Sequence, residues 1–352
     1  MTQLFCYNTI MKIRQRSLFD EAYQLEKLSK IGDPLERLNK AIDWEMFRPI
    51  LKKNVVRKET TKKGGRPPYD LVLMFKILIL QRLYNISDDQ TEYQINDRLS
   101  FQRFLGLTIG DPVPDAKTIW KFKNDLAESN AIEEMFLEFD AALEAEGLIT
   151  HKGTIIDATF VDVPRQRNSR DDNKSIKNGT VPEAWTAPDK AHMLAQKDTD
   201  ARWAKKNEET HYGYKDHVKC DADSKFIMDY GVTPASTHDS EMCLDLLEEN
   251  DNNVFYADSA YSGAPIAEGL PDGCVNKICE KGTRNHPLTQ KQQLNNRKKS
   301  KIRCRIEHIF GFMTNSLGGI NIRSIGFKRA WSNIGLMNLT YNLCRYEILK
   351  RP

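Results

Sequence analysis

The sequence lacks the cysteine and hydrophobic patterns of secreted, disulfide-bonded or membrane proteins. Its seven cysteines are scattered, and without a Cys-x-x-Cys pair they predict neither a zinc ribbon nor a disulfide framework. The most apolar run, residues 71–83, is interrupted by Lys76 and Arg82 and is shorter than the roughly 20 residues of a membrane span. The first residues lack the basic start and apolar stretch of a signal peptide. We therefore expect a reduced, cytoplasmic protein without a membrane partner.

Three kinds of functional site are also absent or disfavoured. No G-x-x-x-x-G-K-[ST] loop is present, which excludes a phosphate-loop ATPase. A tyrosine recombinase needs a His-x-x-Arg motif, but His308 lacks the following arginine, so Tyr341 has no catalytic companions. His211, His217 and Cys220 are close in sequence, yet a strand would turn the cysteine away from both histidines, which disfavours zinc.

What the sequence does contain is a strong separation of charge. Residues 281–352 hold fifteen Lys and Arg side chains but two acids, Glu307 and Glu347, whereas residues 1–280 carry a net negative charge. A cationic segment of this kind attracts the phosphate backbone of a nucleic acid. The isolated Glu307 is then either an ion-pair partner of its basic neighbours or a metal ligand that acts on the bound polyanion.

The residue pattern divides the chain into a helical first half and an α/β second half. We expect a helical region over 1–66, with a basic connector, a further helical region over 67–150, and a domain over 151–347 with a structure-poor polar insertion at about 164–210. Strands alternate with helices in the last of these, which predicts an α/β fold with a mixed sheet. The expected strands are residues 153–163, 211–220, 226–232, 253–261 and 275–280, and the expected helices are residues 239–249 and 298–317.

Two segments of the helical half are candidates for DNA contact. The connector is either a solvated linker or a DNA-contacting arm, with Lys62, Lys63 and Arg66 as its contacts. Three short helices ending in AKTIWKFKNDL are similar to a helix-turn-helix, although packing in a small helical bundle gives the same pattern. The basic side chains that the last of these helices would offer to DNA are Lys117, Lys121 and Lys123.

Three carboxylates of the second half stand out by their context. Asp157 lies within an apolar strand, Asp258 follows the apolar segment VFYA, and Glu307 lies at the edge of the apolar stripe of a helix. Each has a simpler explanation: an edge-strand or capping acid for Asp157, a turn or helix cap for Asp258, and an i, i+4 ion pair with Arg303 for Glu307. Together they form a pattern that suits metal-dependent chemistry.

That chemistry is the cleavage or transfer of a phosphodiester. It uses two divalent ions about 4 Å apart, one at the attacking and one at the leaving oxygen. Mg²⁺ binds hard oxygen ligands, so two aspartates from neighbouring strands and one acid from a helix would suffice. The cationic side chains that would hold the DNA backbone beside these ions are Lys298, Lys299, Lys301 and Arg303.

Four sequence blocks carry a family resemblance: IIDATFVD, HYGYKDHVKCD, VFYADSAYSG and RCRIEHIFGF. Together with GRPPYDLVLMFKILILQRLYNISDDQTEYQINDRLSFQRFLGL they resemble the DDE transposases of bacterial insertion sequences, specifically the family numbered five, over nearly the whole chain. This resemblance implies an RNase H-like catalytic domain and two Mg²⁺ ions, for which Mn²⁺ would substitute. It assigns the catalytic and metal-binding roles to Asp157, Asp258 and Glu307. The usual Tyr and Lys around the glutamate are replaced by Ser300 and Thr314, so Lys301 or Arg305 would hold the terminal phosphate instead.

The resemblance also implies the partners of the protein. These are double-stranded DNA, both element ends and target, and further copies of the chain in a dimer or higher multimer. Trp203, beside Lys205 and Lys206, is a candidate for stacking on an unpaired base, with packing on the core as the alternative. Lys215 is a further candidate DNA contact. The competing functions are a catalytically retired transposase that regulates by binding DNA, and a stand-alone RNase H-like nuclease.

Overall fold

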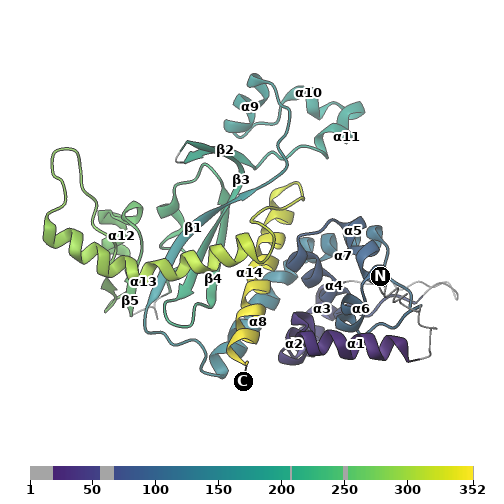
Figure 1. The fold of residues 1–352 in the computed structure, drawn as a ribbon. Helices are drawn as coiled ribbons and strands as arrows, with labels where there is room; N and C mark the ends of the chain where they lie inside the picture. Colours follow the sequence, from purple (N-terminus) through teal and green to yellow (C-terminus); the bar gives the residue numbers. More distant parts are fainter. Residues whose placement is uncertain (1–18, 56–66, 207, 249–252, 352) are drawn as a thin grey trace, which may run out of the picture.

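The computed structural model describes residues 19–55, 67–206, 208–248 and 253–351. The first half of the chain folds into helices (Figure 1). The predicted connector residues Lys62, Lys63 and Arg66 lie outside these ranges. The helices are α1 (Asp20–Ile31), α2 (Pro34–Ala41), α3 (Arg48–Asn54), α4 (Leu71–Tyr84), α5 (Asp88–Asp97), α6 (Leu99–Leu105), α7 (Ala116–Ser129) and α8 (Ala131–Ala145).

Short polar residues cap the beginnings of several of these helices. The side chain of Asp70 accepts hydrogen bonds from the backbone N–H groups of Val72 and Leu73, which satisfies donors that the first turn of α4 leaves free. Ser87 caps α5 and Asp115 caps α7 in the same way. Asp33 likewise caps α2 directly after α1 ends.

Over its described residues, the second half is built on a six-stranded mixed sheet. β1 (Thr154–Asp162) pairs antiparallel with β3 (Glu209–Asp221) and parallel with β5 (Val254–Tyr256). β2 (Arg202–Lys206) and β4 (Ile227–Pro234) pair with β3, and β6 (Val275–Asn276) pairs with β5. This mixed sheet, flanked by helices and preceded by a helical region, confirms the predicted fold class.

The polar insertion is more structured than predicted. It contains α9 (Arg170–Lys177), α10 (Glu183–Thr186), α11 (Ala191–Leu194) and strand β2, and these helices form a separate projection above the sheet in Figure 1. Ser169 and Asp172 form a reciprocal capping box at the start of α9, which explains how so polar a segment begins a helix. The expectation of a structure-poor segment is therefore wrong.

Other predicted elements differ in length. The helix expected from Asp239 is only a 3₁₀ turn, Asp239–Met242, and the strand expected over 253–261 is only three residues long. After α12 (Ala264–Gly269), the long helix α13 (Gln290–Asn315) crosses the sheet in Figure 1. It begins eight residues earlier than predicted.

The last helix, α14 (Phe327–Leu349), was not predicted and joins the two halves of the molecule. It packs against α2, α4, α7 and α8 of the helical region and against β4 of the sheet. One continuous hydrophobic cluster consequently runs from the helices into the sheet. In the part of the chain that the structure describes, no helix is both long and apolar enough to cross a membrane.

Candidate active site

Strand β1 places the first predicted acid in the middle of the sheet. Asp157 lies opposite Val218 of β3, and its side chain is 15% exposed. Its carboxylate accepts a hydrogen bond of 2.9 Å from the backbone N–H of Ala158. Burial raises the pKa of Asp157 to about 6, although the Ala158 hydrogen bond and Arg303 oppose this, while the negative charge of Asp258 adds to it. The carboxylate is therefore held in its charged form at a cost to the fold.

Helix α13 places Arg303 and Glu307 over this strand. A capping box of Thr289 and Gln292 begins the helix, and Ile306 lies on its buried side. One guanidinium nitrogen of Arg303 lies 3.0 Å from the Asp157 carboxylate, and another donates to Glu307. Burial lowers the pKa of Arg303, but Asp157 and Glu307 outweigh it, so the pKa is raised overall. A single guanidinium thus brings together two acids that are far apart in the sequence.

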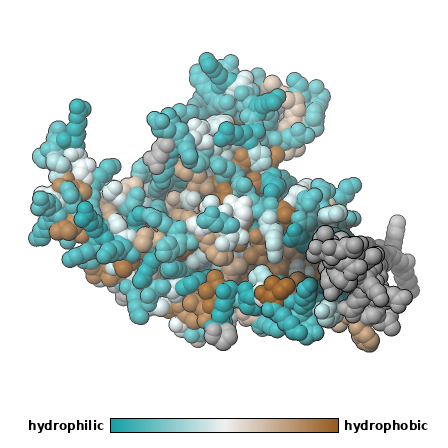
Figure 2. Space-filling model, viewed as in Figure 1, coloured by the Kyte–Doolittle hydropathy of each residue, from teal (hydrophilic) through white to brown (hydrophobic). Residues whose placement is uncertain are grey.

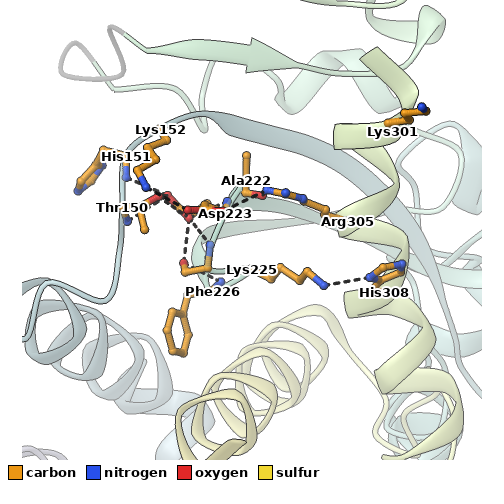
Figure 3. A network of polar contacts seen from close by, with 12 residues as sticks. Thr150, His151, Lys152, Ala222, Asp223, Lys225, Phe226, Lys301, Arg305 and His308 are labelled. Carbon is orange, nitrogen blue, oxygen red and sulfur yellow. Dashed lines mark hydrogen bonds and ion pairs between the residues drawn. The ribbon is translucent and has the colours of Figure 1, made fainter. Parts of the chain in front are cut away.

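The side of α13 that faces the β3–β4 turn is fixed by polar contacts (Figure 3). Arg305 donates to the carbonyl oxygen of Ala222 and lies 3.4 Å from Asp223. The ammonium of Lys225 lies 3.0 Å from Nδ1 of His308, the residue after Glu307. These contacts hold the turn of α13 that carries the catalytic candidate. The sequence offered no signal for them, because the turn and the helix are about eighty residues apart.

Asp258 lies two residues beyond the end of β5. Its carboxylate accepts a hydrogen bond of 2.7 Å from the backbone N–H of Ala260 and caps the 3₁₀ turn Ser259–Tyr261. It is close enough to act electrostatically on both Asp157 and Arg303. Among the described residues, however, no group of three His, Cys, Asp or Glu side chains could hold a metal ion as they stand. In this arrangement Arg303 lies between two of the carboxylates.

The donor set nevertheless fits Mg²⁺ in kind. All three side chains offer carboxylate oxygens, the hard ligands that this ion binds. A cationic group, the guanidinium of Arg303, already lies against Asp157 and Glu307, so the pair accepts positive charge. Asp157, Asp258 and Glu307 are therefore the residues that would hold a divalent ion. When bound, it would supply charge stabilisation at the attacking and leaving oxygens of a phosphodiester.

The predicted DNA contacts on α13 fall into two groups. Lys298 and Lys301 are exposed, whereas Lys299 donates to the carbonyl oxygen of Ile278 at 2.8 Å and is largely buried. Arg305 is likewise engaged with the β3–β4 turn. Figure 2 shows a mostly hydrophilic surface over this part of the molecule. Of the lysines predicted on α13, Lys298 and Lys301 are thus the two whose ammonium groups lie free on the surface of the described chain.

The predicted contacts near the insertion also differ from one another. Lys205 is exposed, Lys206 is half exposed and lies 3.6 Å from Asp239, and Trp203 is 43% exposed with the Arg165 guanidinium over its ring. Lys215 is only 7% exposed and pairs with Asp239 at 2.6 Å. Contact between Lys215 and DNA stays a prediction, and it would require the buried ion pair with Asp239 to open.

Two family matches follow from comparison with known proteins. Residues 149–343 match the family described as Transposase DDE domain, and residues 23–125 match a Transposase domain (DUF772). The first match covers more than half of the chain and includes all three acids. The chain therefore belongs to the transposases with a DDE domain.

A solved structure is also similar. It is the cryo-EM structure of the piggyBac transposase synaptic complex with hairpin DNA, which matches with a TM-score of 0.44 and 11% sequence identity. The match covers 91% of this chain and 76% of that chain.

Proposed function

We propose that this transposase binds the terminal inverted repeats of its own insertion sequence and catalyses Mg²⁺-dependent strand cleavage and strand transfer. It would cut the phosphodiester at the element end and use the freed 3′ hydroxyl to attack target DNA. We place it in the bacterial insertion-sequence family numbered five, with an RNase H-like catalytic domain. It would act at the nucleoid as a dimer or higher multimer.

The observation that carries this proposal is the meeting of Asp157 and Glu307 at one guanidinium. These acids come from a strand and a helix that are separated by about 150 residues of sequence, yet they share a partner within hydrogen-bond distance. Asp258 lies near enough to shift the pKa of Asp157. In the family to which the chain belongs, this is the position expected for the three metal-binding acids.

Arg303 has a second role in this proposal. Its contacts with Asp157 and Glu307 are charge-assisted, and a guanidinium forms contacts of the same kind with phosphate oxygens. Arg303 would contact a phosphate of the bound DNA in a state in which Asp157 and Glu307 hold a divalent ion instead. The same side chain would then neutralise the acids in the free protein and position DNA in the complex.

Cleavage is tested with DNA that carries the ends of the element and its flanks, incubated with Mg²⁺ or EDTA, followed by mapping of strand breaks. Asp258→Asn should abolish cutting and leave binding of the ends largely intact, because the change removes a charge without removing bulk. Asp272→Asn, an exposed acid between α12 and β6, is the matched control and should cut normally. Cutting by Asp258→Asn at the wild-type rate would refute the active-site assignment.

DNA binding is tested by the dependence of affinity on salt. Affinity for DNA falls as salt rises, and each phosphate contact makes the slope of log affinity against log salt steeper by about one. Replacing Lys298 and Lys301 together by glutamine should therefore make this slope shallower by about two. Lys299→Gln is the control: it should leave the slope unchanged, because that ammonium is bound to a backbone carbonyl. Equal slopes for the wild type and the double variant would remove these lysines from the interface.

One observation favours the alternative of a DNA-binding regulator without catalysis. Among the described residues the carboxylates do not form a group that could hold a metal ion as they stand. If Mg²⁺ neither stabilises the protein nor supports strand breaks, while the element ends are still bound, the regulator is the better description. Cleavage of RNA–DNA hybrids without preference for element ends would favour the stand-alone nuclease.

A further inference from the structure

A cavity lies at the junction of the helical region and the catalytic domain. It has a volume of about 720 Å³ and is lined by α4, α5 and α7, by the segment 321–325, by α14 and by Ala195 of the insertion. Figure 2 shows the surface hollowed between the projecting insertion and the helices below it. A cavity of this size falls within the range of small-molecule and cofactor sites. None of the three predicted catalytic acids lines it.

The cavity is lined by three arginines without an acidic partner. Among the described residues, Arg82 donates only to backbone carbonyls, those of Leu317, Gly319 and Asn321. Burial lowers the pKa of Arg82 to about 10, and the nearby charge of Arg323 adds to this. These charges repel one another and favour an anion between them.

The other two arginines bind neutral groups. Arg323 donates to the side chain and backbone carbonyl of Asn85, and Arg329 donates to Asn124 and to the Ile325 carbonyl. Within the described ranges, none of the three arginines forms an ion pair.

The remaining charges of the cavity do not offset these arginines. Lys123 and Asp88 pair with each other, so they contribute little net charge. Asp89 is exposed and lies in the first turn of α5, where the helix dipole stabilises a negative charge. The interior of the cavity therefore remains positive.

Two buried donors of the cavity also lack an acceptor. Nε of Arg82 and Nδ2 of Asn124 are buried and have no hydrogen-bond partner among the described residues. Arg82 itself is 7% exposed. Buried polar groups are almost always satisfied in folded proteins, so unpaired donors call for a partner rich in oxygen acceptors. A phosphate group meets both requirements, negative charge and several acceptor oxygens.

Trp120 adds an aromatic surface at the same cavity. It lies on the face of α7 that also carries Lys123, Asn124 and Ala127, and it is 54% exposed. In the described part of the chain its ring stacks on no other ring and has no cation over it. A large exposed indole beside a cationic cavity is able to stack on a nucleobase.

The cavity has a fixed position relative to the active site. Asn321, which lines it, is bridged to Asp162 at the end of β1, five residues after Asp157. At about 3.3 Å per strand residue, Asp162 lies about 17 Å along β1 from Asp157. This distance equals roughly five base steps of duplex DNA at about 3.4 Å per step. DNA that enters the active site would therefore reach the cavity a few base steps away from the cut.

We propose that this cavity binds one nucleotide unit of the DNA substrate, with its phosphate against Arg82, Arg323 and Arg329 and its base unstacked onto Trp120. The inference rests on the proposed function, since it assumes a DNA substrate, and it adds a second binding site outside the catalytic acids. The chemistry recognised is that of a nucleoside phosphate. The size of the cavity and the bridge to β1 favour a nucleotide within a strand over a free nucleotide.

The charge test uses full-length protein and a labelled duplex in EDTA. Arg323→Gln with Arg329→Gln should make the slope of log affinity against log salt shallower by about two. Arg82 is left unchanged, because it also anchors the segment before residue 321. The control, Lys328→Gln with Lys350→Gln, removes two charges of α14 and its end that are paired with Glu128 and Glu146, and it should keep the wild-type slope. Equal slopes for both double variants would overturn the proposal.

The base contact is tested by photo-cross-linking. A duplex with 5-iododeoxyuridine at successive positions from the cleavage site should cross-link to Trp120 at roughly five steps from the cut. Trp120→Phe should retain binding, and Trp120→Ala should lose most of its affinity for a duplex with one unpaired base. Cross-links that never reach α7, or equal binding by both Trp120 variants, would overturn the assignment.

Free thymidine monophosphate separates the two sources of a nucleotide. Suppose that it competes with the labelled duplex at micromolar concentration, and that the arginine double variant abolishes this competition without changing the affinity for DNA. The cavity then binds free nucleotides, and the proposal is wrong. If cleavage is Mg²⁺-dependent and normal in the double variant, with unchanged DNA affinity, the cavity assignment fails while the transposase function stands. Absence of Mg²⁺-dependent cleavage in the wild type would instead refute the proposed function, and cross-linking to Trp120 would still test the cavity.

Discussion

Asp157→Asn should stabilise the metal-free protein while it abolishes cleavage. Burial raises the pKa of this carboxyl from 3.8 to about 6, so the folded protein binds its proton more tightly than the unfolded chain does. The charged form therefore costs the folded state about two pKa units, or about 3 kcal/mol at 1.36 kcal/mol per unit. The cost is complete above about pH 6 and disappears below about pH 4.

Urea unfolding in EDTA measures this cost directly. The free energy of unfolding of the variant should exceed that of the wild type by up to about 3 kcal/mol at about pH 8, and by about half of that at about pH 5. Asp162→Asn is the control, since this aspartate of the same strand is 54% exposed and should change stability by less than about 0.5 kcal/mol. Mg²⁺ should raise the stability of the wild type and leave Asp157→Asn unaffected. A variant that is less stable than the wild type, or a difference that does not vary with pH, would refute the reasoning.

Two further predictions concern the sheet around the site. Asp216 is wholly buried and receives one hydrogen bond of 3.1 Å from Asn338, and burial raises its pKa to about 7. Asp216→Asn should therefore raise the free energy of unfolding by up to about 4 kcal/mol above pH 7, and by progressively less toward about pH 4. Urea midpoints at two pH values test this, and a constant difference would contradict it. Gly213 has a φ of +152°, and a β-carbon there would meet the carbonyl oxygen of Val161, so Gly213→Ala should cost at least about 2 kcal/mol. Thermal unfolding measures this cost, and an unchanged melting temperature would show that the backbone yields.

Local sequence signals predicted the elements that depend on local physics. The β-branched run around Asp157 forms a strand, and Asp70 and Ser87 begin helices, because a cap or an apolar run acts on its immediate neighbours. The strand after Asn253 was overestimated because VFYADSAY is apolar enough to extend. Asp258 instead caps a 3₁₀ turn and ends it early.

Elements and contacts that depend on distant partners were missed. Helix α14 is buried on most of its sides, so its sequence lacks the contrast between apolar and polar faces that reveals a surface helix. The pairing of Arg303 with Glu307 was foreseeable from their spacing, but its contact with Asp157 crosses 146 residues. Lys215 looked available for DNA because nothing in its own strand reveals that Asp239 neutralises it.

Helix α14 also bears on the order in which the molecule is assembled. Every element that it packs against, from α2 to β4, is synthesised before it. Until the ribosome has made residues 327–349, those partners expose apolar side chains that have nothing to cover them. A nascent or prematurely terminated chain would therefore hold the candidate catalytic carboxylates without the helix that joins them to the rest of the protein. Synthesis of α14 would thus decide when the two halves of a newly made copy become joined.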